Sequence, residues 1–283
     1  MNENVKKIYD KTKDVWGEPQ VYRGIKFYPL KIRDIEYQKW FNFFFTYPKD
    51  SVPDRDIIRM SYLKFATFIL QGTLVSQTDE NYYLLFDFLK HITHSDIVVE
   101  GIILPLQKLG YMPFKKILNL VLYHGIELKD ISLKININGI EFYEDGFDDI
   151  REIILEQNGL SIEYVNEYNS DLEKKMSFFS NNSNSITVED ELFSFCSLLG
   201  ITIQEAGEYT IFQYKKHMKR MVVLMDYKLY KPLEVVGQIK VKGGGIKHYL
   251  SHFGKEGRYD AIFMKKDEFL NSEEISETAK IAQ

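Results

Sequence analysis

Few side chains in this sequence are spaced like the ligands of a metal ion. His248 and His252 are four residues apart, and Asp260 follows them in the chain. Two histidines at that spacing would share one face of a helix, but a zinc site also needs further ligands at a defined spacing. A second pair, His91 and His94, is a weaker candidate still. We therefore expect the chain to bind no metal ion and no other cofactor.

A glycine-rich stretch at residues 242–247 invites comparison with phosphate-binding loops. Its sequence, Lys-Gly-Gly-Gly-Ile-Lys, lacks the second glycine followed by Lys-Ser or Lys-Thr that a P-loop requires. The Gly-x-Ser-x-Gly and His-Glu-x-x-His motifs are absent from the sequence as well. Carboxylates are numerous, but no pair stands out as a general acid and base. The sequence therefore predicts a protein that is not an enzyme.

The single cysteine, Cys196, lies in an apolar stretch at residues 192–199. A nucleophilic cysteine needs a basic neighbour to lower its pKa, and this stretch contains no basic residue. We expect Cys196 to be a buried packing residue. With no second cysteine the chain forms no internal disulfide, which fits synthesis in a reducing cytosol.

The chain is organised around residues 187–231, which we interpret as three helices in quick succession. The first is expected to start at Thr187. The second and third start with the capping boxes Thr202–Glu205 and Thr210–Gln213. In a capping box the Thr side chain accepts from the third backbone N–H, and the Glu or Gln side chain accepts from the Thr backbone.

The third of these helices is amphipathic and basic. A helical wheel places its apolar residues on one side, which we expect to be core: Ile211, Tyr214, Met218, Met221, Val222 and Met225. Its basic residues lie beside and opposite them: Lys215, Lys216, Lys219 and Arg220. This basic arc is either an ordinary solvated face or a contact surface for an acidic protein or nucleic acid. We predict that the four residues form a protein interface.

The spacing around Gly200 also fits a helix-turn-helix, in which the helix after Thr210 would enter the major groove of DNA. However, no Asn or Arg cluster occupies the start of that helix, and Phe212 and Tyr214 resemble packing residues. The net charge of −5 and the pI of about 5.8 also disfavour non-specific nucleic-acid binding by the whole chain. A DNA-binding regulator is therefore the alternative, and we expect nucleic acid not to be a partner.

Composition and patterning exclude three further classes of protein. Hydrophobic residues make up 45% of the 283-residue chain and aromatic residues 14%, which excludes a disordered protein. The N-terminus has no apolar segment of the kind that signal peptides contain. The most apolar run, residues 102–126, is interrupted by lysines and prolines and is too broken to span a bilayer. We expect a soluble intracellular protein that makes no membrane contact.

Two β-hairpins are expected earlier in the chain. One comprises residues 21–28 around Gly24, and the other comprises residues 131–142 with a type I′ turn at Asn138-Gly139. The sequences Gly-Ile-Lys-Phe-Tyr and Gly-Ile-Glu-Phe-Tyr recur in the two hairpins, and Asp-Ile follows ten residues after each glycine. This echo indicates either a duplicated strand–turn–strand–helix unit or a coincidence in a chain rich in Ile and Phe.

The predicted fold is α+β and predominantly α-helical, with two small β-hairpin–helix units and a C-terminal helical module. Helices are expected at 2–15, 32–47, 54–71, 78–91 and 147–157, whereas periodicity does not decide between helix and strand for 97–124. The polar segment 180–185 reads as a linker. Acidic residues dominate before it, and basic residues dominate after Thr210. We divide the chain into regions 1–128, 129–179 and 186–283.

Several of these segments resemble tail and baseplate assembly proteins of tailed bacteriophages, in particular baseplate hub assembly proteins and tail assembly chaperones. The resemblance extends over residues 22–260. It is carried by Gly24–Leu30, Ile137–Ile140, Phe147–Ile154, Gln157–Asn158, Leu199–Thr202, Thr210–Gln213, Tyr227, Tyr230 and Gly237. The family implies no catalytic residues. It implies a structural or chaperone role through contacts with other tail or baseplate proteins or with a second copy, in the host cytoplasm during assembly or in the virion tail.

Overall fold

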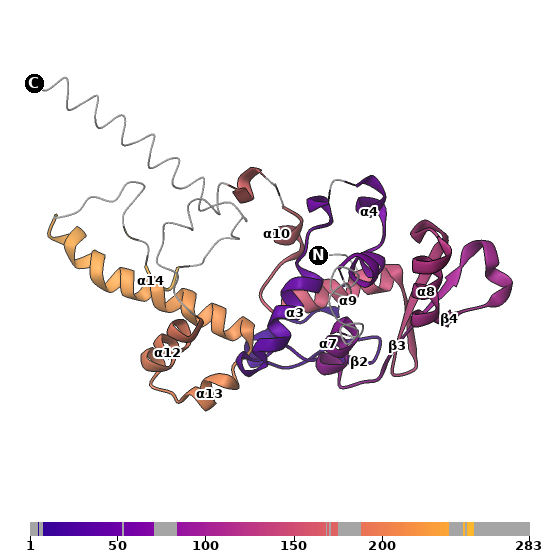
Figure 1. Cartoon of the computed structure of the whole chain (residues 1–283). Coiled ribbons are helices and arrows are strands. Elements are labelled where there is room, and N and C mark those ends of the chain that lie inside the picture. The colour runs from indigo at the N-terminus through magenta and orange to yellow at the C-terminus, as the bar shows by residue number, and fades with distance from the viewer. Residues whose placement is uncertain are drawn as a thin grey trace, which may run out of the picture.

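The computed structural model describes residues 5, 8–52, 54–70, 84–167, 169, 171–174, 188–237, 246 and 248–251. The fold is predominantly helical with two small antiparallel sheets, which confirms the predicted class. We call the described residues up to 174 the body and those from 188 onward the module. In Figure 1 the body holds both sheets, and α14 of the module projects away from it.

The first hairpin lies near the start of the body. Helix α2 (Lys11–Trp16) ends at Gly17, whose left-handed φ of 70° lets the chain reverse. Strands β1 (Gln20–Tyr22) and β2 (Ile25–Phe27) follow and pair antiparallel. Arg23 and Gly24 form the turn between β1 and β2, and both have positive φ, which is the backbone geometry of tight hairpin turns. The predicted hairpin is confirmed.

The second hairpin belongs to a four-stranded antiparallel sheet with the strand order β4-β3-β5-β6. Its strands are β3 (Ile97–Ile103), β4 (Met112–Pro113), β5 (Ile131–Ile137) and β6 (Ile140–Tyr143). Asn138 and Gly139 have φ of 50° and 85°, which confirms the predicted turn between β5 and β6. The boundary that we placed after residue 128 passes between β3 and β5, which are neighbours in this sheet.

Helices surround these strands. The longer ones in the body are α3 (Ile35–Phe45), α7 (Leu84–Thr93), α8 (Phe114–His124) and α9 (Glu144–Gln157). The shorter ones are α4 (Arg55–Arg59), α5 (Tyr62–Lys64) and α10 (Ile162–Asn166). Single 3-10 turns are η1 (Ile32–Asp34), η2 (Lys49–Ser51) and η6 (Leu128–Asp130). The longer 3-10 segment η5 (Leu104–Leu109) is kinked at Leu106, and Phe65–Leu70 (η3) is a π-helical segment.

The prediction of one continuous helix over 54–71 is wrong. The backbone of Met60 is extended, with φ of −68° and ψ of 156°, so α4 ends before it. Ser61 then restarts the helix as its N-cap, because its hydroxyl accepts from the backbone N–H of Lys64. A serine side chain offers the backbone this alternative to a continuing helix. The apolar periodicity on both sides of Met60 does not reveal the break.

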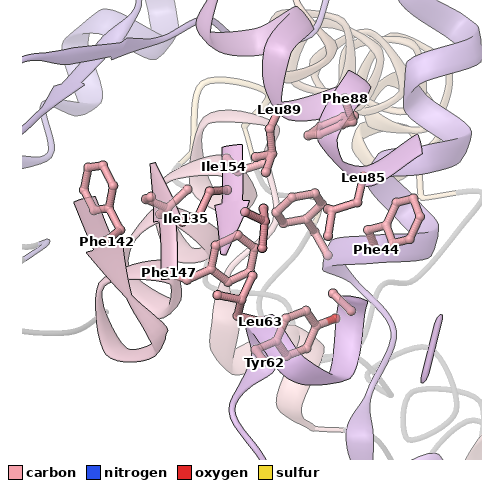
Figure 2. Packing of buried hydrophobic residues seen from close by; sticks show 14 of the residues in the cluster. Phe44, Tyr62, Leu63, Leu85, Phe88, Leu89, Ile135, Phe142, Phe147 and Ile154 are labelled. Atoms are coloured by element: carbon pink, nitrogen blue, oxygen red, sulfur yellow. The ribbon is translucent and has the colours of Figure 1, made fainter. Parts of the chain in front are cut away.

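One core fills the body. Figure 2 shows aromatic and aliphatic side chains of α3 and α7 packed against those of the second hairpin and α9. The ring of Phe45 lies 5.0 Å from that of Phe88 and 6.3 Å from that of Phe147, measured between centroids. The same buried cluster includes residues from both predicted regions 1–128 and 129–179. Most of the abundant aromatic residues before the module are therefore packing residues.

The two hairpins that share the sequence echo contact each other. The ring centroids of Tyr22 and Phe142 are 5.8 Å apart, and the Tyr22 hydroxyl donates to the buried Asp149 carboxylate at 2.6 Å. Asp34, the counterpart of Asp149 in the echo, has a different role: its side chain accepts from the backbone N–H of Lys31 at 3.0 Å. The duplication stays a hypothesis.

Candidate protein-interaction surface on α14

The module consists of α12 (Val188–Leu199), α13 (Ile203–Gly207) and α14 (Ile211–Val235). Both predicted capping boxes are present. Glu205 accepts from the backbone N–H of Thr202 at 2.8 Å, and Gln213 accepts from that of Thr210 at 2.9 Å. The predicted cap of the first helix, Thr187, and the predicted linker 180–185 lie outside the described residues.

The module is joined to the body at the start of α14. Ile211 donates its backbone N–H to Leu30 at 2.8 Å, and Ile32 donates to Tyr209 at 2.9 Å, so the two segments form an antiparallel bridge. Glu208 adds ion pairs with Lys31 and Arg33 beside this bridge. These pairs are exposed and contribute little, since water screens them. The backbone hydrogen bonds therefore define the junction.

The first turn of α14 is covered by the body. Ile211 belongs to the main core, and the side-chain amide of Gln213 donates to the carbonyl of Val15 at 2.8 Å. A recognition helix inserts its N-terminal residues into the major groove, which requires that turn to be free. The geometry of α14 is therefore unfavourable for the helix-turn-helix alternative.

A small core holds α12 and α13 against the first half of α14. Its buried members are Phe195, Cys196 and Ala206, so the prediction that Cys196 is buried is confirmed. The ring of Phe195 lies 5.0 Å from that of Tyr214. Burial, together with the nearby charge of Glu191, raises the pKa of Tyr214 to about 12.

Beyond this small core, the apolar side of α14 is exposed. Val222 and Met225 are 53% and 54% exposed, so the prediction that they belong to the core is wrong. Leu229 and Val236, the C-cap residue of the helix, are 59% and 67% exposed. The reason lies in helix length, because α12 has 12 residues and α14 has 25. A helical wheel assigns directions around an axis but does not tell where the neighbouring helix ends.

We call Val222, Met225, Leu229 and Val236 the α14 stripe. Their separations of three, four and seven residues repeat the spacing of a coiled-coil seam. The same line continues toward the N-terminus through the half-buried Met218 to the buried Ile211. One apolar seam thus begins in the core and ends in solvent, which is typical of a helix that packs against a further helix.

The four predicted interface residues do not form one free face. Lys215 is half-buried, and its ammonium donates to the backbone carbonyl of Asn158 in the body at 3.2 Å. Burial lowers the pKa of Lys215. Lys216 is exposed, with its ammonium 5.3 Å from the centroid of the Phe212 ring, whereas Lys219 is half-buried.

Arg220, the fourth, holds a returning segment of the chain. Its guanidinium donates to the backbone carbonyls of Tyr249 and Ser251 at 2.9 and 3.0 Å. One and two heptads further on, Tyr227 stacks edge-on against Tyr249, and Glu234 accepts from the backbone N–H of residue 246. At 100° per residue these positions lie opposite the α14 stripe. The described residues of this segment, 246 and 248–251, therefore do not cover the stripe.

The charge of α14 is strongly positive. It contains four lysines and arginines in its first half, two lysines in its second half, and the carboxylates Asp226 and Glu234. Glu234 pairs with Lys231 at 2.7 Å, while Lys228 is exposed. At 100° per residue Lys219 and Lys228 lie on either side of the stripe, and Asp226 lies beside Lys219. A partner that covers the stripe would therefore meet flanks of net positive charge, which we call the basic rim.

The histidine pairs and the glycine-rich stretch that we considered as metal or phosphate sites are not part of the α14 stripe. His91 stacks on Tyr37 with centroids 3.8 Å apart, and His94 packs edge-on against Tyr28. His248 contacts Tyr227, whereas His252, Asp260 and the glycines of 242–247 lie outside the described residues. In the described part of the chain, no three His, Cys, Asp or Glu side chains come together as metal ligands would.

Among the described helices, none combines the length and the apolar composition needed to cross a membrane. No protein-family model matches the chain, and neither a curated protein nor a solved structure matches it. The geometry of α14 is therefore the main basis for a functional assignment.

Proposed function

We propose that this chain is a non-enzymatic morphogenesis protein of a phage tail or baseplate, acting as a structural component or an assembly chaperone. The observation that carries the proposal is the α14 stripe, an exposed apolar seam on a helix fixed to the body at one end. Such a seam favours a role in protein–protein contact. The choice of phage assembly comes from the resemblance of the sequence to that family.

The chemistry of α14 specifies the kind of partner. Apolar side chains at heptad spacing fit a second amphipathic helix, whose own apolar residues would pack between them. The basic rim would favour acidic residues beside that partner's seam, which sets orientation and association rate more than affinity. The candidate partners are other tail or baseplate proteins or a second copy of the chain, met in the host cytoplasm or in the assembled tail.

The test compares two changes of equal chemistry at nearly equal exposure. Leu229→Asp places a charge in the stripe, and Phe193→Asp places one on α12, where the side chain is 60% exposed. Tagged chains are expressed during infection, and co-purifying proteins are identified by mass spectrometry. We expect tail or hub proteins with the wild-type chain and with Phe193→Asp, and their loss with Leu229→Asp.

Two results would contradict the proposal. If the wild-type chain co-purifies with no tail or hub protein from lysate of infected cells, the assembly role is wrong. Equal recovery of the same tail proteins with Leu229→Asp would leave the stripe without a function. Charge reversal of the basic residues is a less direct test, because Lys215 and Arg220 also make contacts within the chain.

A further inference from the structure

A second surface lies at the edge of the four-stranded sheet. All seven residues of β3 pair with β5 on one side. On the other side, β4 pairs with Glu100 and Gly101. Among the described residues, no strand continues this pairing along Ile97, Val98 and Val99. These three residues form a free end of the strand, which we call the β3 edge.

The pairing shows which backbone groups of the β3 edge point outward. Residues of an antiparallel strand direct their N–H and C=O groups alternately to one neighbour and the other. Glu100 lies opposite Pro113, which has no N–H and therefore cannot complete a pair of hydrogen bonds with Glu100. The hydrogen-bonded pair with β4 is therefore Gly101 with Met112, so the N–H and C=O of Gly101 point toward β4. By alternation Val99 and Ile97 are directed to the same side.

The hydrogen bonding at the start of β3 also indicates that the backbone groups of Ile97 point away from β5. The carbonyl of Asp96 accepts from Asn138 at 3.2 Å, so Asp96 is directed toward β5, and its neighbour Ile97 is directed away from it. None of the turn, loop and cap hydrogen bonds between described residues uses the backbone N–H of Ile97 or Val99. The N–H groups of both residues therefore face a side of β3 on which no described strand pairs with them.

A cavity of about 640 Å³ lies along this edge. All three residues of the β3 edge line it, together with side chains of α7 and α8 that include Phe86, Phe114 and Tyr123. The rings of Phe86 and Phe114 meet edge-on at 5.7 Å. The cavity opens where β4 ends, because Pro113 turns the chain into α8 and gives the sheet no further donor at that point.

We propose that the β3 edge accepts an extended segment of a partner protein as an additional strand. Backbone groups of the segment would pair with Ile97 and Val99, and an apolar side chain would enter the cavity beside Phe86 and Phe114. This is strand addition, in which main-chain hydrogen bonds supply affinity and pockets for alternate side chains supply specificity. The free backbone donors distinguish an extended peptide from other occupants of an apolar cavity.

The charges around the cavity are balanced. Lys90 and Lys115 line it together with Asp87 and Asp96, and Lys90 already lies 3.4 Å from Asp96. Peptide binding here should therefore vary little with salt, in contrast to binding at the basic rim of α14. This surface does not depend on the proposed function, because it uses different elements.

The first test is hydrogen exchange of the full-length chain. In an antiparallel pair alternate amides are protected, so we expect fast exchange at Ile97 and Val99 and slow exchange at Val98 and Glu100. Peptides of about six residues, selected from a random display library on the full-length chain, then serve as probes. Bound peptide should slow exchange at Ile97 and Val99.

Two matched changes separate backbone from side-chain recognition. Ile97→Pro removes an outward N–H, and Ile97→Ala shortens the same side chain but keeps the N–H. We expect about tenfold weaker peptide binding for Ile97→Pro than for Ile97→Ala, the value of roughly one hydrogen bond. If Ile97→Pro does not fold, N-methylation of alternate peptide residues tests the same bond from the ligand side.

Three outcomes would overturn the proposal. In the first, the selection enriches no peptide whose binding is weakened by Ile97→Pro or by N-methylation. In the second, hydrogen exchange protects all four amides equally in the free chain. In the third, Leu229→Asp abolishes peptide binding. The last would assign the peptides to the α14 stripe.

Discussion

The body and the module bury their apolar residues to very different extents. The body encloses Phe45, Phe88 and Phe147 with essentially no exposed surface, and its core draws on helices and strands from most of its length. The module has three buried residues in its core and leaves the α14 stripe in solvent. The body thus buries its large apolar side chains within the described residues, whereas the second half of α14 leaves its apolar side chains in solvent, as we expect of a helix that packs against a partner.

The largest effect is expected from Phe45→Ala in the body. Removing a fully buried ring at the centre of the aromatic cluster should lower the free energy of unfolding by about 3–5 kcal/mol. Urea denaturation followed by circular dichroism measures this change. Phe193→Ala, at an exposed position of α12, should shift the same curve by less than about 0.5 kcal/mol. Similar shifts for both variants would contradict the central place of Phe45.

Phe195→Ala removes a ring of equal size from the module. We expect a loss of about 3 kcal/mol that is confined to the packing of α12 and α13 on α14. Hydrogen exchange should therefore accelerate in these three helices and stay unchanged in β5 and α9. Acceleration throughout the body would show that the two parts unfold together, and the contrast between them would fail.

Tyr22→Phe should have an intermediate effect. The change removes the 2.6 Å hydrogen bond to Asp149, which joins the first hairpin to α9. Loss of a buried bond to a carboxylate should lower the free energy of unfolding by about 2 kcal/mol. The matched control is Tyr123→Phe, since that side chain is 77% exposed. Thermal unfolding of both variants at one pH distinguishes them.

The smallest effect concerns the pH dependence at the junction. Burial lowers the pKa of Lys215 below its ordinary value of 10.5, so between the two pKa values the folded chain binds fewer protons than the unfolded chain. Stability contributed by this group therefore increases as the pH rises through that interval. Lys215→Met should remove the increase, a difference under about 1 kcal/mol between the two chains. The measurement is the difference in the free energy of unfolding between the wild-type chain and Lys215→Met at several pH values from 8 to 11. If this difference does not change with pH, Lys215 is solvated and the prediction is wrong.

Local patterns in the sequence predicted local structure well. The turn at Asn138-Gly139, the capping boxes at Thr202 and Thr210, and the end of α9 near Asn158 all depend on neighbouring residues, and the structure contains each of them. The sequence does not identify β3 as a strand, because Val98 and Ile102 are apolar although they lie on its more exposed face. The burial of β3 alternates, but its residue types do not. The residues of β3 lie 28 positions (Ile103 and Ile131) to 40 positions (Ile97 and Ile137) from their partners in β5, and no local pattern encodes that pairing.

Prediction of the candidate site failed where distant parts of the chain decide exposure. Val222 and Met225 repeat the apolar spacing of Met218, but α12 is too short to reach them. The heptad spacing that continues to Leu229 and Val236 was present in the sequence and marks the exposed seam. The fate of Lys215 depends on Asn158, more than fifty residues earlier, and is not visible on a helical wheel.

The junction at Leu30 and Ile211 has a mechanical consequence. Helix α14 is anchored there at one end, and its 25 residues extend for about 37 Å at 1.5 Å per residue. It projects to the opposite side of the molecule from β3, β4 and α8, as Figure 1 shows. A rotation of about 10° at the two backbone hydrogen bonds would swing the free end by about 6 Å. The chain thus has the geometry of a lever whose fulcrum is the β-bridge together with the contacts of Ile211, Gln213 and Lys215 with the body.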